Sequence, residues 1–80
     1  MELIVGHVYS AKRRLIIGIC SMLNDRIIIS KVRGLVQYDS PTVRVGRRFP
    51  RVTEEQFLKW AKEDVTTKMP VDRWREESDL

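Results

Sequence analysis

The sequence predicts a small, mainly β domain of the α+β class, an antiparallel barrel of about five strands with one C-terminal amphipathic helix. Short apolar segments rich in β-branched residues recur over residues 3–50, with turn-forming residues between them. From residue 53 the apolar spacing changes to three and four, which is the period of a helix. With 80 residues the chain is short enough that we expect a single core.

The first two strands are expected over residues 3–9 and 14–20. Residues 3–9 are apolar and rich in β-branched side chains, and polar residues follow them. In residues 14–20 the large apolar side chains alternate on one face, with Gly18 opposite them as a bulge or bend. Both segments therefore read as strands.

Three further strands are expected after the turn formers at residues 24–25. Residues 26–32 and 35–38 alternate apolar and polar side chains and follow one another closely. Residues 42–45 continue the same alternation, and we expect the last strand to end by Pro50. The predicted sheet thus occupies the first fifty residues.

The helix is expected over about residues 54–65. Thr53 and Gln56 have the spacing of a capping box, in which each residue bonds the backbone of the other. Four residues form the apolar stripe of this helix and are expected to pack on the sheet: Phe57, Trp60, Ala61 and Val65. Within this stripe we expect Trp60 to be largely buried.

The predicted organisation is one domain. Residues 1–69 form the barrel with its helix, and residues 70–80 form a polar tail that contains Trp74. Short strands in series, closed by a helix, indicate an SH3-like barrel, because closure of a sheet removes its exposed edges.

Three segments resemble small proteins of phages and prophages: Gly6-x-x-Tyr9, Val36-Gln37-Tyr38 and Phe57-Leu58-Lys59-Trp60-Ala61. The resemblance spans residues 3–61, and the matching positions are of a structural kind, namely a turn, core aromatics and the helix stripe. Proteins of this group are largely without an assigned activity. The resemblance therefore implies an SH3-like barrel with a C-terminal helix and a phage or prophage source, and it carries no catalytic residue.

The expected compartment is the cytoplasm, that of the bacterial host if the protein is phage encoded. No apolar run approaches the roughly 20 residues of a membrane-spanning helix, so we expect no membrane partner. The N-terminus lacks the pattern of a secretory signal. A single cysteine, Cys20, forms no internal disulfide, which is typical of a reducing compartment.

Enzyme and metal chemistry are not indicated. A zinc site needs several converging ligands, whereas the chain has one histidine, His7, and one cysteine, Cys20. His7 is also the only side chain with an ordinary pKa near neutrality, and no nucleophile is placed to use it as a base. We therefore expect no enzymatic activity, no metal and no cofactor.

The basic residues form the remaining candidate site. Residues 1–52 contain ten Lys or Arg against three acidic residues, a net charge of +7, while residues 53–80 contain five against eight. The candidate contacts to nucleic acid or to an acidic partner lie in the first turn, before Gly34 and around the end of the last strand: Lys12, Arg13, Arg14, Arg33, Arg44, Arg47, Arg48 and Arg51. Arginine binds phosphate through two parallel hydrogen bonds, and an adjacent aromatic such as Phe49 can stack on a base.

The sequence therefore predicts a non-enzymatic binding protein whose partner is DNA or RNA. An alternative is a phage-encoded inhibitor or modulator that binds an acidic surface of a host protein. A structural or assembly subunit, which would pair through its Ile-rich strands, is a second alternative. It also stays open whether the arginines only keep the protein soluble and pair with Glu54, Glu55 or Asp39.

Overall fold

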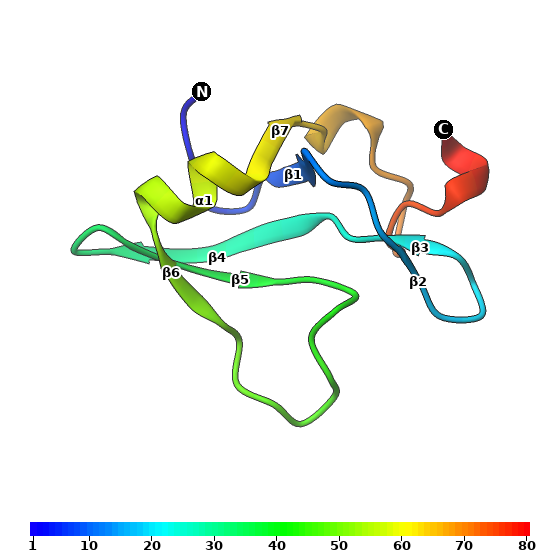
Figure 1. Ribbon diagram of the computed structural model, residues 1–80, viewed down its shortest axis with the longest axis horizontal. Coiled ribbons are helices and arrows are strands. Elements are labelled where there is room, and N and C mark those ends of the chain that lie inside the picture. The colour runs from blue at the N-terminus through cyan, green and yellow to red at the C-terminus, as the bar shows by residue number, and fades with distance from the viewer.

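Seven β-strands, one α-helix and two short 3-10 helices follow one another in the computed structural model, which describes residues 1–80 (Figure 1). The strands and the α-helix are β1 (Val8–Ala11), β2 (Ile16–Ile17), β3 (Met22–Leu23), β4 (Arg26–Val32), β5 (Leu35–Asp39), β6 (Arg51–Thr53), α1 (Glu54–Trp60) and β7 (Ala61–Asp64). The 3-10 helices span Thr66–Lys68 and Glu77–Asp79. No helix has the length and apolar character that crossing a membrane requires.

Five strands form one antiparallel sheet in the order β6-β5-β4-β1-β7, and β2 pairs only with β3. The β4–β5 hairpin has a two-residue turn, because Val32 lies opposite Leu35. Both turn residues have positive φ, 52° at Arg33 and 76° at Gly34. This is the combination that a type I′ turn needs to match the twist of its strands, and it explains the glycine.

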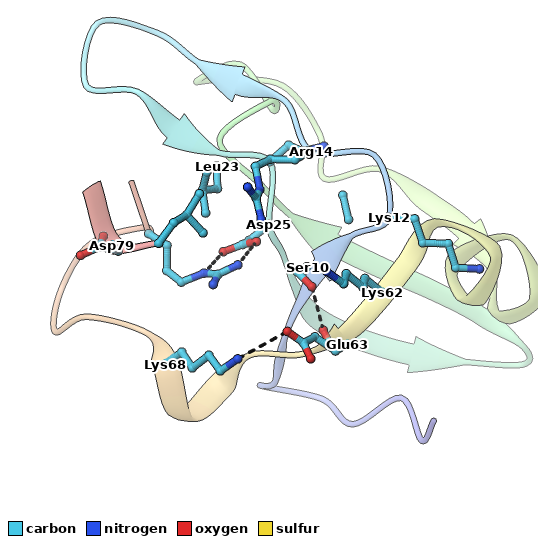
Figure 2. A pocket seen from close by; sticks show the side chains of 13 residues that line it. Ser10, Lys12, Arg14, Leu23, Asp25, Lys62, Glu63, Lys68 and Asp79 are labelled. Carbon is cyan, nitrogen blue, oxygen red and sulfur yellow. Dashed lines mark hydrogen bonds and ion pairs between the residues drawn. The ribbon is translucent and has the colours of Figure 1, made fainter. Parts of the chain in front are cut away.

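The C-terminal segment is held on the β2–β3 hairpin. Leu23 donates its backbone N–H to the Arg75 carbonyl over 2.9 Å, and Glu77 donates to the Ser21 carbonyl over 2.8 Å. The Arg75 guanidinium forms two hydrogen bonds with the buried Asp25 carboxylate, which Figure 2 shows as dashed lines. Residues 70–80, expected as a polar tail, thus include a segment that is packed and bonded to the rest of the domain.

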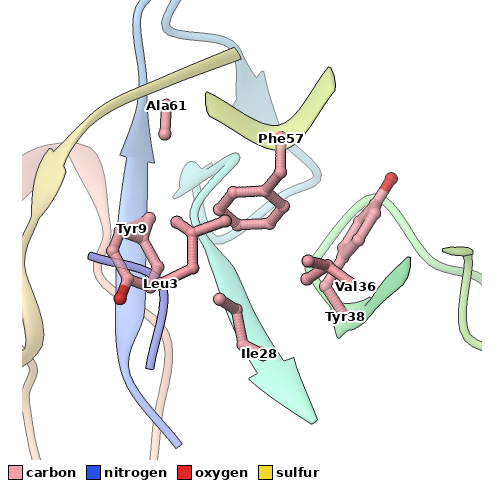
Figure 3. Close-up of a cluster of buried hydrophobic side chains, with 7 residues drawn as sticks. All are labelled: Leu3, Tyr9, Ile28, Val36, Tyr38, Phe57 and Ala61. Carbon is pink, nitrogen blue, oxygen red and sulfur yellow. The ribbon is translucent and has the colours of Figure 1, made fainter. Parts of the chain in front are cut away.

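The core lies between the sheet and α1 (Figure 3). Its buried members are Leu3, Tyr9, Ile28, Val36, Tyr38, Phe57 and Ala61. The Phe57 ring is fully buried and meets Tyr9, Tyr38 and Trp60 edge to face, with centroid separations of 5.5, 6.0 and 5.2 Å. Aromatic rings favour this geometry because the positive edge of one faces the negative face of the other. One aromatic side chain of α1 therefore organises the core.

The structure confirms a mainly β domain with a five-stranded antiparallel sheet and one helix. The prediction of a closed barrel is wrong, because β6 and β7 are the two ends of the strand order and do not pair. The chain between these two strands is α1, which joins the two edges of the sheet without a ladder of hydrogen bonds between them.

Three strand predictions are corrected. The first strand is β1, which begins at Val8 because Gly6 forms a turn with φ 88°. Within residues 14–20 only Ile16–Ile17 is a strand, and the chain turns at Gly18, which also has positive φ. Residues 42–45 form consecutive turns instead of a strand, closed by the backbone bond from Val43 to the Ser40 carbonyl. The sheet continues only at β6, where Leu35 of β5 pairs with Thr53.

The helix begins where the sequence predicts it and ends earlier. The capping box between Thr53 and Gln56 is present, which confirms the start. The prediction of a helix to residue 65 is wrong, because Ala61 is extended and pairs with Ala11 of β1. The helix is therefore internal, with β7 after it, and is not C-terminal. Trp60, expected to be largely buried, is half-buried and packs against the core.

Candidate nucleic-acid interface

The outer face of the β4–β5–β6 ribbon is the surface that carries most of the predicted basic site. Pairing sets Ser30 of β4 beside Gln37 of β5, and Gln37 beside Arg51 of β6. Side chains of directly paired residues share a face, and successive residues along a strand alternate between faces. Since Val36 and Val52 pack toward the core, their neighbours Gln37 and Arg51 point outward.

Three adjoining hollows cross this face. The first, of about 230 Å³, is lined by Arg33 and Arg51, and the second, of about 510 Å³, by Arg47, Arg48 and Arg51. Gln37 lines both of them. The third, of about 440 Å³, is lined by Arg44 and Arg47. We call the resulting row the arginine track, and its members are Arg33, Arg44, Arg47, Arg48 and Arg51.

The arginine track is exposed and carries no ion pair with an acidic residue. The acidic residues that the sequence offered as partners are engaged elsewhere. Glu54 lies 3.2 Å from Lys31, Glu55 lies 3.4 Å from Lys59, and the Asp39 carboxylate accepts the backbone N–H of Ser40 over 2.7 Å. The track therefore presents positive charge that no ion pair within the domain engages, although Asp39 lines the third hollow beside Arg44 and Arg47.

The loop of residues 40–50 positions three members of the track, Arg44, Arg47 and Arg48. Figure 1 shows this loop on the side of the sheet away from α1. Gln37 donates its side-chain N–H to the Phe49 carbonyl over 3.2 Å, and the Tyr38 backbone N–H donates to the Pro50 carbonyl over 3.1 Å. These bonds tie the end of the loop to β5. They leave Phe49 43% exposed, and this residue lines the second and third hollows.

Two aromatic side chains from distant parts of the chain line the third hollow. Phe49 comes from the loop before β6, and Trp74 comes from the C-terminal segment. Trp74 is half-buried, and the bonds of Arg75 to the β2–β3 hairpin hold its segment in place. The sequence places Trp74 in the tail but carries no signal for this position, because only tertiary contacts bring the tail to the hollow.

The basic residues of the first turn do not join the arginine track. Lys12 and Arg14 line a separate cavity between β1, β7 and the C-terminal segment (Figure 2). Arg13 lines a further hollow beside Arg26 and Trp60. The predicted site residues are thus divided among separate surfaces.

Arg26 is a cation that sequence reasoning left out of the site. Its guanidinium carbon lies 4.0 Å from the centroid of the Trp60 ring and 4.1 Å from that of Tyr38. A guanidinium over an aromatic face is attracted by the negative charge of that face. Burial lowers the pKa of Arg26, with the nearby Tyr38 acting in the opposite direction. Arg26 therefore belongs to the packing of the core edge.

No group of three or more His, Cys, Asp or Glu side chains is arranged to hold a metal ion. His7 Nδ1 lies 2.7 Å from an Asp64 carboxylate oxygen, and Cys20 is exposed.

Comparison with known proteins gave no match: no family model, no curated protein and no solved structure matches the chain.

Proposed function

We propose that the protein binds nucleic acid, with the sugar-phosphate backbone of the ligand running along the arginine track. The observation that carries this proposal is the set of five exposed arginines without acidic partners in three adjoining hollows. Arginine side chains donate pairs of parallel hydrogen bonds to phosphate oxygens. Neutralising phosphates releases condensed counterions from the nucleic acid, which favours binding at low salt.

The preferred ligand is single-stranded. Phe49 and Trp74 line the same hollow as Arg44 and Arg47, so an unpaired base that leaves the backbone beside these arginines meets aromatic side chains. Stacking of one base on an aromatic ring contributes about 1–3 kcal/mol and tolerates any base. A base within a duplex is already stacked on its neighbours and gains nothing from these rings. We therefore infer binding with little sequence preference and weaker association with duplexes.

We further assign the sheet to the SH3-like class. The strand order β6-β5-β4-β1-β7, with one short helix between β6 and β7, supports this assignment. A phage or prophage source is proposed with it, and only the resemblance of three sequence segments supports that source. The protein acts in this proposal without enzymatic chemistry, as a binding module.

The test is to remove two charges from the track in the variant R47Q/R48Q. The matched control is K59Q/K68Q, which removes the same net charge from two exposed lysines outside the track. Binding of labelled single-stranded and duplex oligonucleotides is followed by fluorescence anisotropy between about 50 and 200 mM salt. For a single strand the slope of log affinity against log salt should lose about 1.4 in R47Q/R48Q, because each phosphate contact contributes roughly 0.7.

The control should keep the slope of the wild type. If both double variants lose the same affinity, general charge attraction explains binding, and the track is not the site. No detectable binding of any oligonucleotide at about 50 mM salt rules the proposal out and points to an acidic protein surface as the partner.

A further inference from the structure

A second basic site lies in the cavity between β1, β7 and the C-terminal segment, which we call the polar cavity. Its volume is about 480 Å³, and Lys12, Arg14 and Lys62 are among its walls (Figure 2). Only three of its thirteen lining residues are hydrophobic, and none is aromatic. A ligand here is recognised through charge and hydrogen bonds, since the cavity offers no ring on which a base can stack.

Arg75 is the buried basic side chain among the residues that line the polar cavity. The residue is 7% exposed, and its Nε and Nη2 donate to the Asp25 carboxylate over 2.7 and 2.9 Å. Nη1 has no hydrogen-bond partner in the protein, and yet no fully buried side-chain nitrogen or oxygen lacks a partner. Nη1 therefore keeps some exposed surface, and Arg75 is one of the residues that line the cavity.

The charge of the cavity wall is positive. Lys12, Arg14 and Lys62 are exposed and form no ion pair. Every acidic residue of the wall already has a basic partner within 4 Å: Asp25 with Arg75, Glu63 with Lys68 and Asp79 with Arg73. The three unpaired cations and the free edge of the Arg75 guanidinium thus remain for an anion.

We propose that the polar cavity binds the phosphate or diphosphate group of a small molecule. The Arg75 and Arg14 guanidinium groups and the Lys12 and Lys62 ammonium groups provide the charge-assisted donors that a phosphate with two or more negative charges needs. The cavity is larger than one phosphate ion and falls within the range of about 300–1,000 Å³ typical of small-molecule sites. It leaves room for a second phosphate or for the organic part of a phosphorylated compound.

This inference does not depend on nucleic-acid binding, and the test separates the two. Pyrophosphate is the probe, and binding is measured by calorimetry at low salt for the wild type, for K12Q/K62Q and for R47Q/R48Q. The last variant carries the same net charge as K12Q/K62Q but leaves the polar cavity intact. We expect K12Q/K62Q to lose affinity about tenfold or more, since two charge-assisted contacts are removed. R47Q/R48Q removes donors only from the arginine track, so the pyrophosphate binding of the polar cavity should be unchanged.

A second measurement follows Arg75 directly. The side-chain ¹⁵N signals of this buried guanidinium should shift on titration with pyrophosphate, whereas those of Arg47 should not. Competition distinguishes the source of the phosphate. A small-molecule site keeps its pyrophosphate affinity when an oligonucleotide saturates the arginine track, and a backbone-phosphate site loses it.

Three outcomes would overturn the proposal. They are the absence of saturable pyrophosphate binding to the wild type, an equal loss of affinity in the two double variants, and displacement of pyrophosphate by the oligonucleotide. R75K serves as a further check because it keeps a positive charge beside Asp25 and removes the Nη1 amino group that has no partner in the protein. If R75K does not fold, the comparison of K12Q/K62Q with R47Q/R48Q still decides.

Discussion

The ion pair between Asp25 and Arg75 joins the β3–β4 corner to the C-terminal segment, and breaking it should destabilise the whole domain. The Asp25 and Arg75 side chains are 2% and 9% exposed, and two hydrogen bonds connect them. Removing one partner of such a buried pair leaves an uncompensated charge and costs about 3–5 kcal/mol. Since a domain of this size is stable by about 5–15 kcal/mol, the loss in D25A is a large fraction of the total.

The magnitude can be measured with urea unfolding and thermal melting of D25A, R75M and the double variant D25A/R75M. A loss of about 3 kcal/mol lowers the melting temperature of a domain this small by at least about 12 °C. The double variant should be destabilised less than the sum of the single variants, because it leaves neither charge buried alone.

An exposed ion pair provides the control for this experiment. The Glu55 and Lys59 side chains are 79% and 76% exposed and lie 3.4 Å apart on α1. Water screens such a pair, so E55Q should change the free energy of unfolding by less than about 1 kcal/mol. If D25A and R75M are each within about 1 kcal/mol of the wild type and their effects add, the C-terminal segment is not held by this pair and the reasoning fails.

Two further results are expected. Trp60 packs on Phe57 and covers Arg26, so W60A should cost about 3 kcal/mol, and a melting temperature within a degree or two of the wild type would show that α1 is not packed as described. The hydrogen bond from Arg73 lowers the pKa of Asp79 to about 2, and hydrogen bonds from His7 and Thr66 lower the pKa of Asp64 although burial opposes them. Because both folded-state pKa values lie below the unfolded value of 3.8, this stability is present above about pH 4 and is lost as the pH falls toward 2. The urea midpoint should fall over that window, and D79N should show a smaller fall, whereas an unchanged slope in D79N contradicts the assignment.

The elements predicted correctly from the sequence are those whose signals are local. β4 begins and ends at the predicted residues 26 and 32, because β-branched side chains and the turn formers before them mark a strand without reference to the rest of the chain. The start of α1 is likewise local, because the capping box lies within four residues. Residues 42–45 carry the same alternation and form turns instead of a strand, and β5 pairs with residues 51–53 in their place.

For the candidate site, too, the sequence predicted some features and the tertiary structure decided others. Composition and charge identified the arginines, because an excess of cations over acids in the first 52 residues is visible without a fold. The sequence did not show which of these arginines lie together on one surface. Gln37 joins two hollows because β5 pairs with both β4 and β6, and Trp74 reaches the third hollow because Arg75 is bonded to Asp25, fifty residues away in the chain.

By itself the sequence determined a small, mainly β fold, the strand over residues 26–32, the start of the helix and an uneven distribution of charge. These properties follow from side-chain periodicity, turn chemistry and composition, each of which acts over a few residues. Only the tertiary structure decided that the helix stops at Trp60, where Ala61 gains a strand partner in β1. It also separated the arginine track from the polar cavity, because contacts between residues far apart in the chain depend on the pairing order of the whole sheet.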